Sequence, residues 1–149
     1  MSAYEMVKDQ LSKMVPFAIH TGVVIDELSG EGATCHLEQR GEVENHIQSM
    51  HAGALFVLGE QASGAAYAGA FVDRMMALRP VAAKAEISYL KIAKGTITAK
   101  AKVRDDVDGL KAKLDQDGKV VFAVDVDLFD ADELHVASMV VDWHVKSLS

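Results

Sequence analysis

The most unusual segment of the chain is apolar on nearly every side of a helix. It runs roughly from Met50 to Phe71, is rich in Ala and Gly, and carries one charged side chain, Glu60. A helix that is apolar all round is either buried in a protein core or spans a membrane. Its interspersed glycines and the Glu60-Gln61 pair argue against a span, because unpartnered carboxylates are rare in membranes. We therefore predict a buried helix that neighbouring backbone approaches closely.

The residues before this segment predict a short helix followed by a β-hairpin. Residues 3–15 place apolar side chains at three- and four-residue spacing, which predicts an amphipathic helix that Pro16 ends and that packs as a lid or flank. Residues 20–28 and 33–39 read as two strands joined by the turn Ser29-Gly30-Glu31-Gly32.

After Pro80 apolar residues recur at every second position, which is typical of half-buried strands. Short turns at Lys94-Gly95 and Asp117-Gly118 predict antiparallel neighbours. The pattern therefore predicts an α+β fold in which a curved antiparallel sheet of about five to six strands covers one long central helix. The expected strands of this later part cover residues 84–89, 96–103, 120–128 and 136–146. Such a sheet must protect its edges, so we expect a homo-oligomer paired edge to edge, a dimer or a dimer of dimers.

Composition narrows the class of protein. A length of 149 residues with no repeat or linker predicts one domain over residues 1–149. The single cysteine, Cys35, excludes an internal disulfide, and the first residues lack the layout of a signal peptide, so we expect a cytoplasmic protein without a membrane span.

Charge argues against a nucleic-acid partner, because the net charge is −7 and phosphate binding needs a basic face. The segment from Lys84 to Lys113 is an exception, with eight basic residues against four acidic ones. This basic segment is either a set of solvated strand faces or a docking strip for an anionic ligand.

The start of the long helix carries the candidate chemistry. The first amides of a helix have no intrahelical partner and lie at the positive end of its dipole, so the Ala52 N–H can hold an oxyanion. A carboxylate in an apolar helix resists ionisation, which moves Glu60 toward the range of a general base. With Asn45 and His51 nearby, these groups indicate acyl transfer to water.

Spacing then predicts a site made by two subunits. Eight residues separate Ala52 from Glu60, or roughly 12 Å along one helix. The two cannot act on one carbonyl within a single chain. If both act, the Ala52 amide of one chain must face Glu60 of its partner across a two-fold axis.

The same residues resemble a known family. Asn45-His46-Ile47-Gln48-Ser49-Met50-His51-Ala52-Gly53, followed by Ala54-Leu55-Phe56-Val57-Leu58-Gly59-Glu60, is similar to the loop and helix start of hotdog-fold acyl-CoA thioesterases. The likeness is strongest to the phenylacetate-type branch or to an uncharacterised, DUF4442-like relative, and extends over about residues 15–146. Ala52 stands where that branch has the first Gly of His-Gly-Gly, and Ala82 stands near a position that is often polar.

The resemblance implies a hotdog fold and hydrolysis of an acyl-CoA thioester to a carboxylic acid and CoA. It implies that Glu60 is the general base or nucleophile and the Ala52 amide the oxyanion donor, while Asn45 positions the water or thioester and His51 orients the loop. We expect the substrate also to contact Gly53, Ser63 and Gly64, and we expect no metal and no cofactor. Two alternatives stay open: a non-catalytic acyl-CoA or fatty-acid binding protein, and an enoyl-thioester hydratase, for which the Glu60-Gln61 pair is mildly suggestive.

Overall fold

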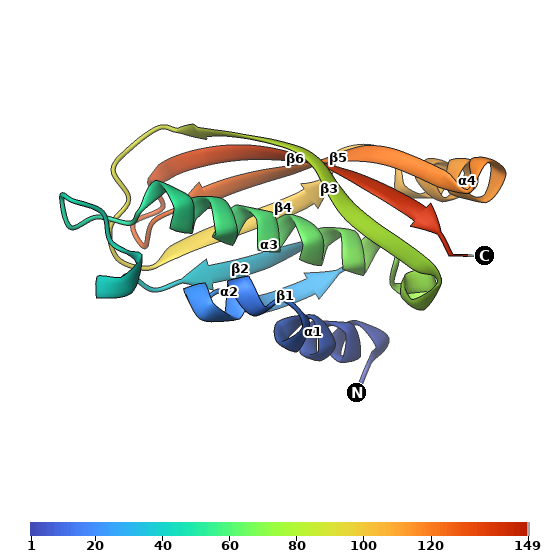
Figure 1. The fold of residues 1–149 in the computed structure, drawn as a ribbon, viewed down its shortest axis with the longest axis horizontal. Helices are drawn as coiled ribbons and strands as arrows, with labels where there is room; N and C mark the ends of the chain where they lie inside the picture. The colour runs from blue at the N-terminus through green and yellow to red at the C-terminus, as the bar shows by residue number, and fades with distance from the viewer. Residues whose placement is uncertain (149) are drawn as a thin grey trace.

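The fold, described here for residues 1–148 of a computed structural model, is one long helix lying along a curved antiparallel sheet (Figure 1). The long helix is α3 (Ala52–Ala70), so the central prediction from the sequence is confirmed. The six strands lie in the order β1-β2-β4-β5-β6-β3, and every pair is antiparallel. They are β1 (Val24–Ser29), β2 (Gly32–Leu37), β3 (Leu78–Tyr89), β4 (Ile97–Val103), β5 (Lys119–Phe129) and β6 (His135–Ser147).

Small residues let α3 lie close against the sheet. A Cβ on Gly69 would collide with the backbone carbonyl of Ser29 in β1, and a Cβ on Gly59 would lie 2.5 Å from the Met139 sulfur in β6. Alanines fill most of the remaining buried face of α3. The glycines that argued against a membrane span therefore serve packing within the domain.

We expect Gly69→Ala to destabilise the protein by about 1–3 kcal/mol, because its methyl group meets rigid backbone rather than a movable side chain. Gly64→Ala is the matched control in the same helix, since its Cβ would lie 3.5 Å from Trp143, an ordinary contact. That control should be neutral or gain about 0.5–1 kcal/mol. Urea unfolding of the two variants measures both changes, and equal stability of the two would contradict this account of the packing.

The N-terminal region contains one helix more than the sequence predicted. Helix α1 (Ala3–Met14) is confirmed and ends before Pro16, but Pro16 then begins a second helix, α2 (Pro16–Thr21). Proline suits the first position of a helix because its fixed φ is helical and its missing N–H has no partner there. Gly22, with φ of 99°, ends α2. The first strand therefore starts at Val24, and the prediction that it starts at His20 was wrong.

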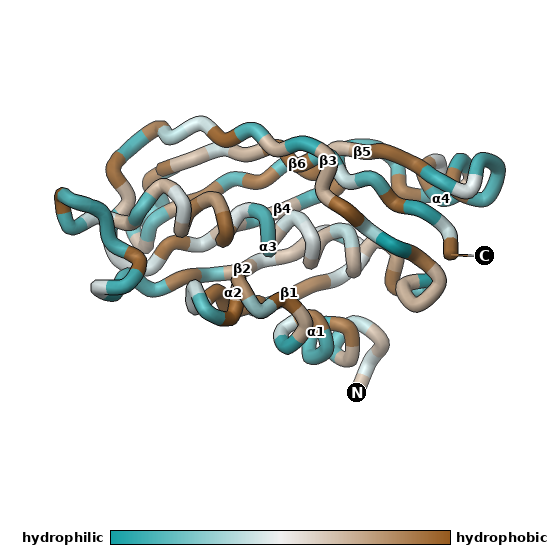
Figure 2. The backbone as a smooth tube through the Cα atoms, viewed as in Figure 1, coloured by the Kyte–Doolittle hydropathy of each residue, from teal (hydrophilic) through white to brown (hydrophobic). Residues whose placement is uncertain are grey.

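A helix also replaces one of the expected short connections. Between β4 and β5 lies α4 (Val107–Asp117), capped by the Asp106 side chain and ended by Gly118 in the left-handed conformation. Its apolar side chains Leu110 and Leu114 are buried at four-residue spacing. Figure 2 shows hydrophilic residues along much of α4, which is why its pattern is weaker than that of α3. Two 3-10 turns, η1 (Gly41–Val43) and η2 (Val72–Ala77), complete the described elements.

Strand β3 is an edge of the sheet and pairs only with β6. Pro80 lies within it, which an edge strand tolerates because one side of its backbone needs no ladder donor. Most of its residues are exposed within one chain. Among residues 1–148, no helix is long and apolar enough to cross a membrane.

The basic segment 84–113 is distributed over several elements, and three of its eight basic side chains form ion pairs with carboxylates. Arg104 pairs with Asp125 at 2.6 Å, and Lys111 with Asp73 at 3.0 Å. Lys100 and Lys102 of β4 face Asp127 and Asp125 across the β4–β5 ladder. These pairings favour the solvated-face interpretation over a docking strip for an anion.

Candidate active site

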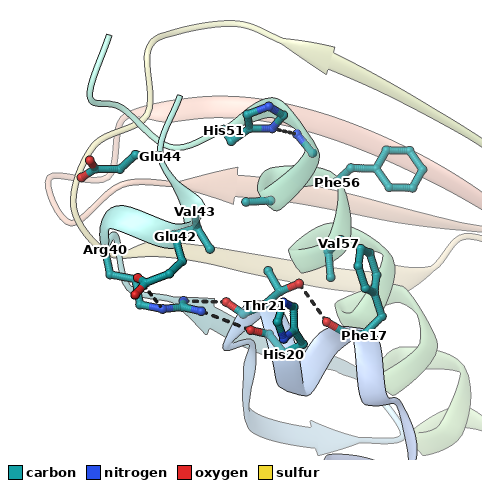
Figure 3. Close-up of a pocket in the computed structure, with 12 residues that line it drawn as sticks. Phe17, His20, Thr21, Arg40, Glu42, Val43, Glu44, His51, Phe56 and Val57 are labelled. Carbon is teal, nitrogen blue, oxygen red and sulfur yellow. Dashed lines mark hydrogen bonds and ion pairs between the residues drawn. The ribbon is translucent and has the colours of Figure 1, made fainter. Parts of the chain in front are cut away.

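The N-terminus of α3 presents a free backbone amide. The His51 side chain caps the helix, its Nδ1 accepting from the Gly53 N–H at 2.8 Å (Figure 3). The Ala52 N–H, in contrast, has no hydrogen-bond acceptor anywhere in the described chain. The Ala52 carbonyl accepts from the Tyr89 hydroxyl at 2.9 Å, which ties the helix start to β3. One exposed donor thus remains at the positive end of the dipole.

The predicted site residue Asn45 folds the loop before α3. Its Oδ1 accepts from the backbone N–H groups of Ile47 and Ser49, both at 3.0 Å. Its Nδ2 donates to the Ser49 hydroxyl at 2.8 Å. These bonds use the main capacity of the Asn45 amide within its own loop, so in a single chain it positions the backbone that leads to His51 and Ala52.

Glu60 is half-buried on α3 in surroundings that supply no partner. Burial raises the pKa of the Glu60 carboxyl above its ordinary value. No residue from 1 to 148 donates a hydrogen bond to this carboxylate or forms an ion pair with it. A carboxylate that is desolvated and unpaired suits a general base and gives a fold no evident stability.

The Ser63 hydroxyl makes no hydrogen bond with the Glu60 carboxylate. The Ser63 hydroxyl donates to the Glu60 backbone carbonyl at 2.6 Å and accepts from the Trp143 indole at 3.0 Å. Ser63 is fully buried, and both functions of its hydroxyl are used in the interior. We therefore assign Ser63 a structural role, whereas Gly64 lies on the half-buried side of the helix next to Glu60.

Three hollows lie along α3, and the predicted site residues are divided among them. The Arg40 cleft, about 610 Å³, contains His51 and Gly53, and the Asn45 cleft, about 720 Å³, contains Asn45 and Ala52. The Glu60 cavity, about 320 Å³, contains Glu60 and Gly64. Because α3 is continuous, Glu60 and the Ala52 amide stay roughly 12 Å apart in one chain.

The Arg40 cleft is built around a capped helix end (Figure 3). The Arg40 guanidinium donates to the carbonyls of Thr21 at 2.6 Å and His20 at 3.1 Å, the last residues of α2. Phe17 and Phe56 flank the same space. Arg40 was not among the predicted site residues, and its contacts explain it as a cap on the last carbonyls of α2.

The Glu60 cavity is lined by two buried polar residues that were not among the predicted site residues. Gln61 and Tyr67 are 5% and 2% exposed, and both line the cavity. Neither side chain makes a hydrogen bond with another described residue, and the Tyr67 hydroxyl is fully enclosed. A buried unpaired hydroxyl costs about 1–3 kcal/mol. The helical spacing of the sequence could have indicated these two residues, since positions 60, 61, 64 and 67 share one face of α3.

A group that resembles a catalytic triad occurs on β5 and β6. The Asp127 carboxylate and the Ser138 hydroxyl both reach Nε2 of His135, each at 3.0 Å. A relay needs the carboxylate and the nucleophile on different ring nitrogens, so this arrangement is not a triad. The described residues also contain no group of three metal-ligating side chains.

The comparisons with known proteins agree with this architecture. Residues 4–145 match the family model described as "Domain of unknown function (DUF4442)". The chain belongs to the DUF4442 family. No curated protein matches it significantly.

Solved structures give this DUF4442 chain the hotdog fold. A Pseudomonas aeruginosa protein of unknown function, described as a probable thioesterase, has a TM-score of 0.82 and 25% identity, with 96% of this chain and 95% of that one covered. The Escherichia coli PaaI protein of the phenylacetic acid degradation operon has a TM-score of 0.72 and 21% identity, covering 99% and 94%. A thioesterase family protein from Silicibacter pomeroyi has a TM-score of 0.76 and 14% identity, covering 98% and 99%. The predicted membership of the hotdog thioesterase superfamily is confirmed.

Proposed function

We propose that this DUF4442 protein hydrolyses an acyl-CoA thioester to a carboxylic acid and CoA. The observation that carries the proposal is the pair of unsatisfied groups on α3: a free Ala52 amide at the helix start and an unpaired, desolvated Glu60 carboxylate. An oxyanion donor and a base are the two groups that water attack on a thioester requires. The thioesterase descriptions of similar structures support the same chemistry.

A second copy of the chain completes the proposed site. The half of α3 nearest its start is incompletely covered, with Gly53 exposed and Phe56 and Val57 half-buried. The β3 edge beside it has no strand partner on its outer side within the described residues. A two-fold dimer that pairs these surfaces brings the Ala52 amide of one protomer to Glu60 of the other.

The proposed reaction uses few groups. Glu60 takes a proton from water, and the resulting hydroxide adds to the thioester carbonyl carbon. The Ala52 N–H of the partner holds the oxygen of the tetrahedral intermediate, where negative charge develops. The C–S bond then breaks and the CoA sulfur leaves, taking up a proton. Asn45 and His51 are positioning residues, because their hydrogen bonds hold the backbone that presents Ala52.

A thiol-release screen over short, long and aromatic acyl-CoAs tests the function. We expect saturable release of free CoA from at least one of these three classes of acyl-CoA. Thermal stabilisation by an acyl-CoA without any thiol release would instead favour the binding-protein alternative. Loss of enoyl-thioester absorbance would favour a hydratase.

A further inference from the structure

Helix α1 carries an apolar stripe that the folded chain leaves incompletely covered. Val7, Leu11 and Met14 recur at four- and three-residue spacing on one face of the helix. No residue of α1 is fully buried, and Val7 and Leu11 are only half-buried. All three side chains line the Glu60 cavity. The stripe therefore borders an open volume of about 320 Å³, where a packed helix would meet other side chains.

The rest of the cavity wall is also mostly apolar. It comes from η2, β3 and β6 through Met75, Met76, Leu78, Pro80 and Trp143. Pockets for small ligands begin at roughly 300 Å³, so the cavity has room for one apolar group. A ligand in this space would cover the stripe of α1 as well as its own surface, and removing apolar surface from water favours binding.

The Glu60 cavity has a polar end and an apolar end. Along α3 its lining begins with Glu60 and Gln61 and continues through Gly64 to Ala68. Gly64 has no side chain to interrupt that path. Eight residues separate Glu60 from Ala68, or roughly 12 Å of helix. A linear chain of about eight carbons, joined by bonds of about 1.5 Å, can therefore run from Glu60 to the far end.

Helix α1 runs antiparallel to α3 along this path (Figure 1). Its C-terminal end leads into α2, whose Phe17 lines the Arg40 cleft at the start of α3. Its N-terminal end lies at the turn after β1, since a Cβ on Gly30 would lie 3.3 Å from the Tyr4 hydroxyl. That turn is beside the C-terminal end of α3. Met14 is therefore nearer the Glu60 end of the cavity, and Val7 is at the far end.

Charge decides which part of an acyl-CoA suits the Glu60 cavity. No Lys, Arg or His side chain lines it, and its one charged group is the Glu60 carboxylate. The phosphates of CoA would meet only that negative charge. The Asn45 cleft, which holds the Ala52 amide, is lined by Lys91, and Lys91 forms no ion pair with another described residue. A thioester held between Ala52 of one protomer and Glu60 of the other would thus direct its CoA arm to the Asn45 cleft and its acyl chain to the Glu60 cavity.

We propose that the Glu60 cavity holds the acyl chain, that the apolar stripe of α1 forms one of its walls, and that the preferred substrates are neutral aliphatic thioesters of about eight carbons. Val7 and Leu11 are then specificity-determining residues. A chain that ends in a carboxylate is disfavoured, because its charge has no counter-ion in the cavity. This inference rests on the proposed thioesterase function for its substrate, but binding of the chain does not require turnover.

Isothermal titration of the wild-type protein with non-hydrolysable S-alkyl-CoA thioethers, from ethyl to dodecyl, tests the inference. We expect the affinity to rise about threefold to fourfold with each methylene, the value of one buried CH₂, up to about eight carbons and then to level off. S-(7-carboxyheptyl)-CoA should bind about tenfold more weakly than S-octyl-CoA, or weaker still. Equal affinity for the ethyl and octyl thioethers, or for the octyl and carboxyheptyl ones, overturns the inference.

Two variants fill the cavity from opposite walls. Val7→Phe occupies the far end and should lower the affinity for S-octyl-CoA about tenfold, while the affinity for S-butyl-CoA stays within about twofold. Gly64→Leu occupies the middle of the path, so its affinity should level off after about four carbons. Met6→Phe is the matched control, because Met6 is 50% exposed on α1 and does not line the cavity. Cooperative thermal unfolding shows that each variant is folded. If both cavity variants keep the wild-type dependence on chain length, the inference is wrong.

Hydrogen exchange locates the bound chain. S-octyl-CoA should slow the exchange of amides in residues 3–14, whereas S-ethyl-CoA should not, because only the longer chain reaches the stripe of α1. Protection confined to other segments contradicts the assigned place.

Thiol release separates this inference from the proposed function. If no acyl-CoA is hydrolysed but the thioether affinity follows chain length and falls in the cavity variants, the thioesterase proposal fails and this inference stands. If acyl-CoAs are hydrolysed but the thioether affinity is independent of chain length, the inference fails and the thioesterase proposal stands.

Discussion

Glu60→Gln should lower kcat for thioester hydrolysis by about 10²–10⁴-fold, the usual contribution of a positioned base. The carboxamide keeps the shape of the side chain but cannot accept the proton of the attacking water. Thiol-release assays on the purified variant measure the loss of kcat. Glu27→Gln is the matched control, since Glu27 is an exposed carboxylate on β1. Unchanged turnover in Glu60→Gln across a panel of acyl-CoAs would exclude Glu60 as the base.

The same variant should be more stable than the wild type at neutral pH. Because burial raises the pKa of Glu60, the folded protein binds more protons than the unfolded chain above the unfolded pKa, near 4.5. Its stability therefore falls as pH rises from that value through the folded pKa. Urea unfolding should show wild type and Glu60→Gln converging at pH 4 and below, and diverging as pH rises, with the variant more stable. The wild-type kcat/KM should increase with pH over the same interval, as the base loses its proton.

Ala52→Pro should lower kcat by about 10²–10³-fold, the usual cost of losing one oxyanion donor. The substitution removes the Ala52 N–H and little else. Ala52 is the first residue of α3, where proline is favoured, and His51 has φ of −61° and ψ of 141°, which suits a residue before proline. The Ala52 carbonyl that accepts from Tyr89 is retained. Ala52→Gly is the matched control, because it keeps the N–H and should keep activity.

Mixing the two inactive variants tests whether the site is shared between protomers. A heterodimer of Ala52→Pro and Glu60→Gln contains one pairing of an intact Ala52 amide with an intact Glu60, and one pairing of both lesions. It should recover about half of the wild-type activity. If both groups act within one chain, no pairing is intact and the mixture stays inactive. Refolding or coexpression of differently tagged chains isolates the heterodimer for this assay.

The α3 helix is the element that the sequence determined most completely. Its apolar run and small residues predicted both its burial and its bounds to within two residues. The period of two after Pro80 likewise predicted β4, β5 and β6, because alternation is a local property of a half-buried strand. It predicted only residues 84–89 of β3, whose first half is mostly exposed and lacks the alternation. The helices α2 and α4 were missed. A proline at a helix start resembles a stop signal in sequence, and α4 buries little more than Leu110 and Leu114.

Part of the candidate site was likewise predictable from the sequence, and part was not. Sequence alone identified Glu60 as the odd carboxylate and set its distance from Ala52, because both follow from the rise of one continuous helix. Only the tertiary structure decided which groups are free. The folded chain uses the side chains of Asn45 and Ser63 in hydrogen bonds, and it leaves the buried Tyr67 hydroxyl without a partner among the described residues. Hydrogen-bond satisfaction depends on atoms brought together from distant parts of the chain, which no local pattern records.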